Sequence, residues 1–183
     1  MASDRLIVLF GGPAGGGKST LARAWCAARD RSAHVQLDDV REQIVFGLAD
    51  PQSPGATQSE QYELSVAACC ALARSFAGAG FDVAVDDVLP PVAYEAHWRP
   101  ALAGLDVRIV IVVPSLDATL ERARSREKRV REAIIREQHA ASLAWPERHR
   151  IDTTGLSVEE SLRLVEAAVA GVDLSADDER MSG

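Results

Sequence analysis

Short apolar runs alternate with longer helix-forming stretches along the chain, and this alternation is the clearest structural pattern in the sequence. Apolar runs of about 4–8 residues bounded by glycine, proline or aspartate are typical of buried strands. The strands predicted in this way cover residues 6–10, 33–37, 81–85, 107–113 and 150–154. Because strands that alternate with helices favour a parallel sheet, we expect an α/β fold, a three-layer α/β/α sandwich around a five-stranded parallel sheet.

The longest predicted helix covers residues 60–77 and follows a loop of residues 49–59 that contains two prolines and a glycine. Glycines shortly after residue 77 predict the end of this helix. The run at 107–113 is the most apolar of the strands, so we expect it near the centre of the sheet. The apolar positions of the long helix are Leu64, Ala68, Leu72 and Phe76.

Length and composition indicate one globular domain. The chain has 183 residues, of which 47% are hydrophobic and 26% are charged, an ordinary balance for a domain with a substantial core. We expect the domain to cover residues 1–171. Residues 172–183 are acidic and polar, and we expect them to form a disordered tail.

Charge and cysteine content narrow the classes of function. The net charge of −7 does not favour attraction to nucleic acid. Cys26, Cys69 and Cys70 lack the spacing of a zinc site, and we interpret them as small buried residues. No apolar run reaches about 18 residues and no signal peptide precedes the first strand, so we expect a cytoplasmic protein that does not span a membrane.

A glycine-rich segment between the first strand and the first helix carries the strongest chemical signal. Its pattern is GxxxxGK[ST], the P-loop, with the required strand before it and helix after it. The glycines let backbone N–H groups point inward at a phosphate, and the helix N-terminus favours the same anion. We expect Lys18 to reach the β- and γ-phosphates and the Ser19 hydroxyl to bind Mg²⁺. The predicted nucleotide-binding residues are Gly12, Pro13, Ala14, Gly15, Gly16, Gly17, Lys18, Ser19 and Thr20.

Two adjacent carboxylates, Asp38 and Asp39, follow the second predicted strand, which we expect beside the P-loop strand. A carboxylate there can orient an acceptor hydroxyl and take its proton, so Asp38 is the candidate general base. Capping of the next helix is the alternative role, and we favour it for Asp39. Arg41 either holds the acceptor or a transferring phosphate, or is a solvated surface arginine.

A second carboxylate pair, Asp86 and Asp87, ends the third predicted strand. An aspartate at the end of an apolar strand is typical of the Walker-B position, which holds Mg²⁺. Side chains alternate along a strand, so only one of the two faces the site. We assign Asp86 to the metal and Asp87 to the acceptor or the next helix, and a plain strand-end role for both is the alternative.

A basic segment at residues 122–131 stands out in this acidic protein. Cations at a helix end complement the helix dipole, so a solvated helix terminus is one interpretation. The other is a lid that closes over the triphosphate and places arginines on the transferring phosphoryl group, with Arg126 as the first candidate. The basic side chains are Arg122, Arg124, Arg126, Lys128, Arg129 and Arg131.

The histidines and two of the tryptophans have no pattern that predicts chemistry. Trp25 and Trp145 are interpreted as packing residues. The histidines have neither triad nor metal spacing, and we interpret all four as structural or exposed. They are His34, His97, His139 and His149.

Taken in order, five motifs resemble the small P-loop kinases of the zeta-toxin and chloramphenicol phosphotransferase group. The motifs are GPAGGGKST, LDDVR, VAVDDVL, the arginine-rich segment and IDTTG. The resemblance spans roughly residues 5–168, and residues 83–113 are especially similar to chloramphenicol phosphotransferase. It implies that Asp38 matches the base and Arg41 the acceptor-side arginine of the group. Residues 47–59 match no member of the group. The resemblance also places three residues near the nucleotide base: Asp152, Thr153 and Thr154.

These observations predict a kinase that uses ATP and Mg²⁺ to phosphorylate a hydroxyl of a small molecule, such as an antibiotic or a sugar-like metabolite. One alternative is a polynucleotide 5′-hydroxyl kinase, because the Asp-Asp-x-Arg piece is also similar to phage-type polynucleotide kinase. The acidic charge disfavours it. Another alternative is a nucleotide-dependent ATPase or switch module. A GTPase is disfavoured because the chain contains no asparagine for an NKxD motif.

Overall fold

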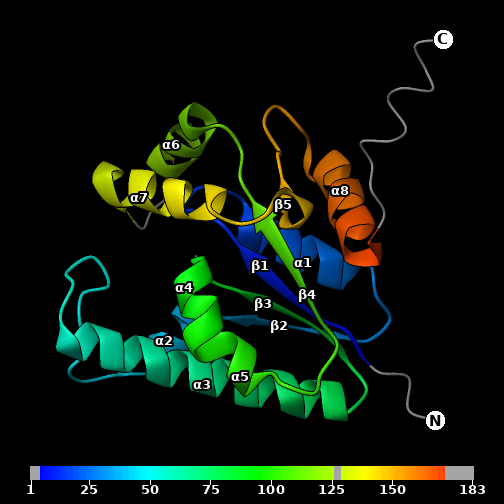
Figure 1. Ribbon diagram of the computed structural model, residues 1–183, viewed down its shortest axis with the longest axis horizontal. Helices are drawn as coiled ribbons and strands as arrows, with labels where there is room; N and C mark the ends of the chain where they lie inside the picture. The colour runs from blue at the N-terminus through cyan, green and yellow to red at the C-terminus, as the bar shows by residue number, and fades with distance from the viewer. Residues whose placement is uncertain (1–4, 126–128, 172–183) are drawn as a thin grey trace.

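The computed structural model of the chain describes residues 5–125 and 129–171. Its five strands form one parallel sheet in the order β2-β3-β1-β4-β5, with helices on both faces (Figure 1). The predicted three-layer α/β fold is therefore confirmed. The strands are β1 (Ile7–Gly11), β2 (Ser32–Gln36), β3 (Asp82–Asp86), β4 (Val107–Val112) and β5 (Arg150–Ile151).

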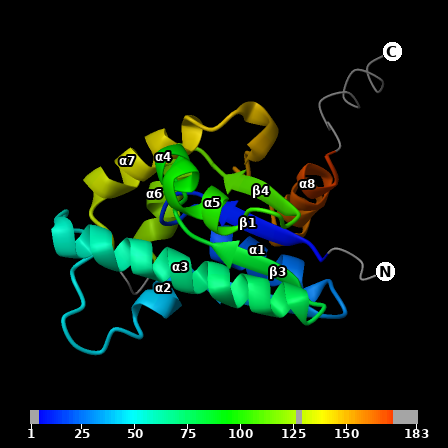
Figure 2. The same cartoon turned by 60° about the horizontal axis from the view of Figure 1, so that its bottom comes forward.

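The helices divide between the two faces of the sheet, as the turned view in Figure 2 shows for α3 in front and α1 behind. Helices α1 and α8 pack on one face, and α3 with the α4–α5 segment packs on the other. None of the helices in the described part of the chain is long and apolar enough to cross a membrane. The helical elements are α1 (Lys18–Ala27), α2 (Leu37–Arg41), α3 (Ala56–Gly78), α4 (Pro91–Ala93), the π-helix η1 (Tyr94–Trp98), α5 (Arg99–Ala101), α6 (Leu116–Arg124), α7 (Glu132–Leu143), the 3₁₀-helix η2 (Glu147–His149) and α8 (Val158–Ala170).

The strand order confirms one expectation and corrects another. Strand β4 lies near the centre of the sheet, as expected, next to the central P-loop strand β1. Strand β3 lies between β1 and β2, so the second strand is not beside the P-loop strand. Phe10 of β1 and Gln36 of β2 both pair with Asp86, which places the ends of these three strands side by side. The carboxyl-end edge of the sheet therefore gathers the P-loop and both carboxylate pairs.

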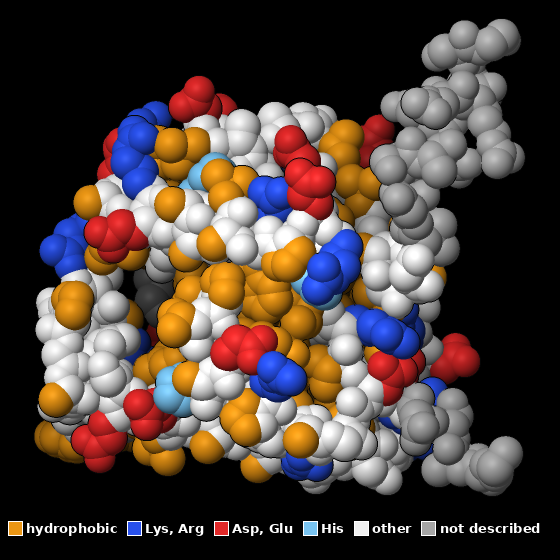
Figure 3. Space-filling model, viewed as in Figure 1, with side chains coloured by type: hydrophobic (Ala, Val, Ile, Leu, Met, Phe, Trp, Pro, Cys, Tyr) orange, Lys and Arg blue, Asp and Glu red, His pale blue; other side chains and the backbone are white. Residues whose placement is uncertain are grey.

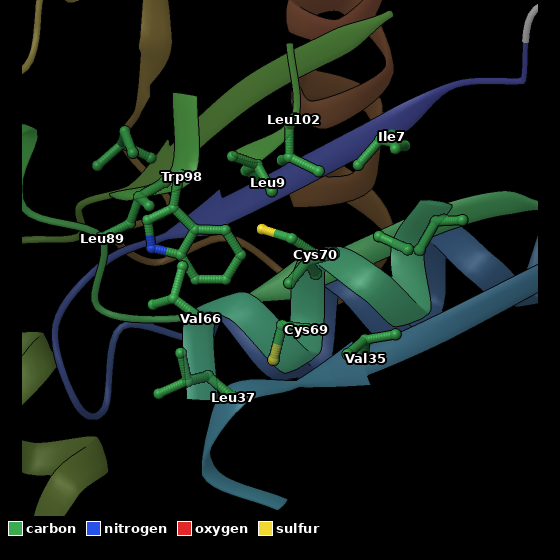
Figure 4. Packing of buried hydrophobic residues seen from close by; sticks show 14 of the residues in the cluster. Ile7, Leu9, Val35, Leu37, Val66, Cys69, Cys70, Leu89, Trp98 and Leu102 are labelled. Carbon is green, nitrogen blue, oxygen red and sulfur yellow. The ribbon is translucent and has the colours of Figure 1, made fainter. Parts of the chain in front are cut away.

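Helix α3 packs on the sheet through small side chains. Val66, Cys69 and Cys70 are buried and point toward the sheet in Figure 4, and the cysteines are free thiols, as expected. The apolar pattern misleads here, because Leu64 is 60% exposed and Phe76 is 37% exposed. Small side chains allow the helix to approach the sheet closely, and the larger residues then lie on its outer side.

Candidate active site

The P-loop joins β1 to α1, and its shape depends on glycine at two positions. Gly12 has φ +142° and Gly15 has φ +86°, a region that side chains other than glycine rarely adopt. A Cβ at Gly15 would lie 2.5 Å from the carbonyl oxygen of Thr119, and one at Gly12 would collide with the carbonyl of Val112. The loop therefore packs directly against β4 and α6, and α1 begins at Lys18 with its N-terminus open to an anion.

A pocket of about 290 Å³ opens at the end of this loop. Backbone N–H groups of a glycine-rich loop and a helix N-terminus bind phosphate, and Arg122 of α6 adds a cation on the opposite wall. The pocket has the composition of a polyphosphate site. Its lining residues are Gly15, Gly17, Lys18, Ser19, Thr20 and Arg122.

Asp86 faces the P-loop at the end of β3. The Ser19 hydroxyl donates to Asp86 Oδ1 at 3.0 Å, and the carboxylate side chain is only 7% exposed. Within residues 5–125 and 129–171, no three His, Cys, Asp or Glu side chains form a metal site. A hydroxyl beside one carboxylate fits Mg²⁺, which in nucleotide sites takes one or two protein oxygens and completes its shell with phosphates and water.

His34 of β2 also contacts this carboxylate, a contact that the sequence did not predict. Its Nε2 lies 2.6 Å from Asp86 Oδ2, so both oxygens of Asp86 have a partner. His34 pairs with Ala84 in the sheet, and residues 34 and 86 point to the same face because side chains alternate along strands. The alternation of side chains along the two strands could have predicted this contact, but the prediction also requires knowing that β2 and β3 are neighbours.

Asp87 points away from Ser19 and into the layer that α3 and η1 form. Tyr62 of α3 donates its hydroxyl to Asp87 Oδ2 at 2.8 Å, and the Trp98 indole donates to Tyr62 at 3.3 Å. Burial raises the pKa of Asp87, although the Tyr62 hydrogen bond and the charge of Lys18 oppose the shift. The two aspartates thus lie on opposite sides of the strand end, Asp86 toward the P-loop and Asp87 toward α3.

Asp38 and Arg41 lie on the short helix α2, at the end of β2. Asp38 is exposed in the first turn, and Asp39 accepts a hydrogen bond from Gln36. Arg41 is only 6% exposed, and its Nη2 donates to the carbonyl of Ala49 at 2.8 Å. Its Nε has no hydrogen-bond partner among the described residues. A buried guanidinium with an unused donor is suited to bind an anionic or hydroxylated group.

The loop of residues 42–55 is held against α2 and α3. The Gln61 side chain donates to the carbonyl of Gly47 and accepts from the N–H of Ala49, which fixes the loop by both atoms of one amide. Val45 is 87% exposed and Phe46 is 94% exposed. The loop therefore presents apolar side chains to solvent next to the carboxylate-bearing helix α2.

Residues 152–154 lie beside α6 and close to the P-loop pocket. Arg122 Nη2 donates to the carbonyl of Thr153 at 3.1 Å. Asp152 accepts from both the N–H and the hydroxyl of Thr154, and Thr154 in turn accepts from the N–H of Ser115. The structure therefore brings Arg122 together with the segment predicted near the nucleotide base.

The basic segment is only partly described. Arg126, the first lid candidate, and Lys128 lie outside the described residues. Beyond them, the Gln52 side chain donates to the carbonyl of Arg129 and accepts from the N–H of Arg131. One amide thus joins the loop of residues 42–55 to the chain that enters α7. The tail predicted at residues 172–183 also lies outside the described residues.

Sequence reasoning missed a second contact on the P-loop. The N–H of Ala14 donates to Gln138 Oε1 of α7 at 2.9 Å, across 124 positions of the chain. No local sequence pattern signals this contact, because it depends on how α7 packs on the loop.

A larger hollow of about 1230 Å³ runs along the β4 edge, but it contains no P-loop residue. Figure 3 shows apolar side chains at the centre of this face, and Tyr94, Ile109 and Trp145 are among the residues that line the hollow. Of the predicted site residues, Asp152 alone lines it in the described part of the chain. The residues predicted to bind phosphate therefore line the smaller pocket and not this hollow.

Comparison with known proteins identifies the family of the chain and proteins that share its fold. The family model described as AAA domain matches residues 7–149. The fold is similar to that of the tunicamycin resistance protein of Deinococcus radiodurans, with a TM-score of 0.66, 19% identity, and coverage of 92% of this chain and 97% of that chain. A gluconokinase from Sinorhizobium meliloti 1021 matches with a TM-score of 0.64, 16% identity, and coverage of 91% and 92%.

The shikimate kinase of Acinetobacter baumannii, solved with shikimate, matches with a TM-score of 0.63, 16% identity, and coverage of 94% and 97%. A search of the curated proteins found no similar sequence. At these identities the structural matches show the shared α/β fold.

Proposed function

Because the chain belongs to the AAA domain family, we propose that it is an ATP-dependent phosphotransferase that acts on a hydroxyl of a small molecule. The observation that carries the proposal is the pairing of Ser19 with Asp86 at the mouth of the P-loop pocket. Ser19 and Asp86 would hold Mg²⁺, which neutralises charge on the β- and γ-phosphates of ATP. Lys18 extends from the first turn of α1 toward the same phosphates.

In this proposal the nucleotide binds on the side of the site that α6 and the basic segment form. Arg122 lines the phosphate pocket and contacts Thr153, so it lies between the polyphosphate and the segment assigned to the nucleotide base. Arg126 is proposed as the lid arginine that stabilises charge on the transferring phosphoryl group. These assignments support a nucleoside triphosphate as the phosphoryl donor, and we propose ATP.

The acceptor binds on the α2 side in this proposal. Asp38 is the base: it is exposed in the first turn of α2, where it can accept the proton of a hydroxyl that attacks the γ-phosphate. Arg41 lies on the same helix and is the acceptor-side arginine in this proposal. Asp87 completes the acceptor side, but Tyr62 already occupies one of its oxygens.

A small acceptor is favoured over a polynucleotide. The net charge of −7 disfavours general attraction to a phosphate backbone. Three of the proteins with this fold carry names that refer to tunicamycin, gluconate and shikimate, which supports a small hydroxylated acceptor. We propose no nucleic-acid or membrane partner.

The test is a measurement of ADP formation from Mg·ATP with a panel of acceptors. The panel contains sugars, hydroxy acids, hydroxylated antibiotics and a 5′-hydroxyl oligonucleotide, and Lys18→Ala is the control. We expect ADP formation to depend on one small-molecule class and to vanish in Lys18→Ala. Stimulation by the oligonucleotide alone would favour the polynucleotide kinase, and acceptor-independent turnover would favour an ATPase module.

A further inference from the structure

Gln138 of α7 holds a backbone group of the P-loop. Its Oε1 accepts from the N–H of Ala14 at 2.9 Å, and Ala14 is only 7% exposed. The donor is a backbone N–H, so the amide oxygen must face Ala14 and the amide nitrogen must face elsewhere. In the described part of the chain, the amide oxygen of Gln138 has this partner and no hydrogen bond from its Nε2 is found, and the side chain is half-buried, so the two N–H donors can reach a ligand.

The position of this contact relates it to phosphate binding. In a P-loop, successive N–H groups point into a concavity that receives the phosphates. Ala14 directly precedes Gly15, which lines the phosphate pocket, so an acceptor on the N–H of Ala14 lies beside the rim of that pocket. A side-chain amide at the rim can donate to a phosphate oxygen while it keeps its hydrogen bond to the loop.

Helix α7 is well placed to carry such a group, because it is packed on the P-loop. Ile135, one turn before Gln138, is buried in a cluster with Ala14 and Ala123. His139 Nε2 lies 2.9 Å from the carbonyl of Pro114, and Ser142 donates to the carbonyl of Gln138. The Gln138 backbone is thus fixed by contacts on both sides of it.

We propose that Gln138 binds the γ-phosphate of ATP: Oε1 stays on the N–H of Ala14 and Nε2 donates to a γ-phosphate oxygen. This inference rests on the proposed function and adds a residue that distinguishes ATP from ADP. It also gives α7, which follows the basic segment, a direct contact with the group that is transferred.

Two variants separate this role from a purely structural one. Gln138→Glu keeps an oxygen acceptor for Ala14 but replaces the donor with a negative charge, whereas Gln138→Ala removes both atoms. Ala140→Glu is the matched control, because it adds the same charge at an exposed position of α7. Calorimetry measures the dissociation constants of Mg·ADP and of a non-hydrolysable Mg·ATP analogue for each protein.

We expect Gln138→Glu to weaken binding of the ATP analogue by about tenfold or more, the scale of a charge-assisted hydrogen bond, with ADP affinity within about twofold of wild type. Ala140→Glu should change neither constant by more than about twofold. Retained ADP binding shows that the variant is folded. Unchanged analogue affinity in Gln138→Glu, or equal losses for ADP and the analogue, would overturn the proposal. The test measures binding alone, so its outcome is independent of whether the acceptor screen succeeds.

Discussion

Ser19 and Asp86 are joined by a hydrogen bond of 3.0 Å although 67 positions separate them in the chain. The parallel pairing of β1 with β3 produces this contact, because Phe10 pairs with Asp86 and the P-loop continues from β1. Asp86→Asn keeps the side-chain shape but removes the charge that a metal needs. We expect Mg·ATP to bind about tenfold more weakly while metal-free ATP binds as before. Calorimetry with and without EDTA checks this, and equal losses in both conditions would assign Asp86 a structural role.

Asp38 on α2 and Asp87 at the end of β3 are both near the proposed acceptor side, and we predict that only Asp38 acts as the base. Asp38→Asn should lower phosphoryl transfer by roughly 10²-fold or more, because the base is lost while asparagine keeps the shape of the side chain in the first turn of α2. ATP affinity should be unchanged, and Asp39→Asn is the matched control with nearly full activity. Steady-state kinetics, with an acceptor that stimulates ADP formation, measures the rate of phosphoryl transfer in each variant. Full activity in Asp38→Asn with loss in Asp87→Asn would move the base to the end of β3.

The backbone conformation of Gly15 predicts that a side chain at this position lowers the stability of the protein. Alanine at this position would meet the Thr119 carbonyl and would also adopt an unfavourable φ. Gly104 has a similar φ of +82° with nothing within 4 Å of an added Cβ. Alanine at Gly104 therefore measures the effect of the unfavourable φ alone, without a steric contact. Gly104→Ala should lower the free energy of unfolding by about 1 kcal/mol, and Gly15→Ala by more. Urea unfolding measures both, and equal effects would show that the P-loop adapts to a side chain.

Buried thiols on α3 predict a pH dependence of stability. Burial raises the pKa of Cys69 to about 12 and that of Cys70 to about 11, from an ordinary value of 9.0. The unfolded chain releases these protons first as pH rises, so the free energy of unfolding should fall above about pH 9. Urea unfolding at pH 8 and at pH 10 measures the fall. It should be smaller in the double variant Cys69→Ala, Cys70→Ala, and an equal fall in both proteins would contradict the assignment.

Much of the fold followed from local sequence patterns. The strands gave clear apolar runs, and the P-loop could be assigned because the glycine spacing of its pattern reflects a backbone requirement at Gly12 and Gly17, which both have positive φ. Local patterns do not determine which strands are neighbours, since that depends on how the crossovers pack. The position of β3 between β1 and β2, and with it the contact of His34 with Asp86, was therefore missed.

The buried face of α3 and the contact of Gln138 with Ala14 were missed for a related reason. Apolar spacing favoured Leu64 and Phe76 as inward positions, but close approach to the sheet selected the smaller side chains of the helix. Hydrogen bonds between a side chain and a distant backbone group leave no periodic signal, so the role of Gln138 required coordinates.

The most direct test of the phosphotransferase assignment is to follow the γ-phosphoryl group itself. ATP labelled with ³²P at the γ-position is incubated with Mg²⁺, the protein and the acceptor class that stimulates ADP formation, and the products are separated. The phosphotransferase assignment predicts that the label moves to the acceptor in an amount equal to the ADP formed, and that Lys18→Ala transfers none. Label recovered only as inorganic phosphate, at a rate that the acceptor does not change, would contradict it.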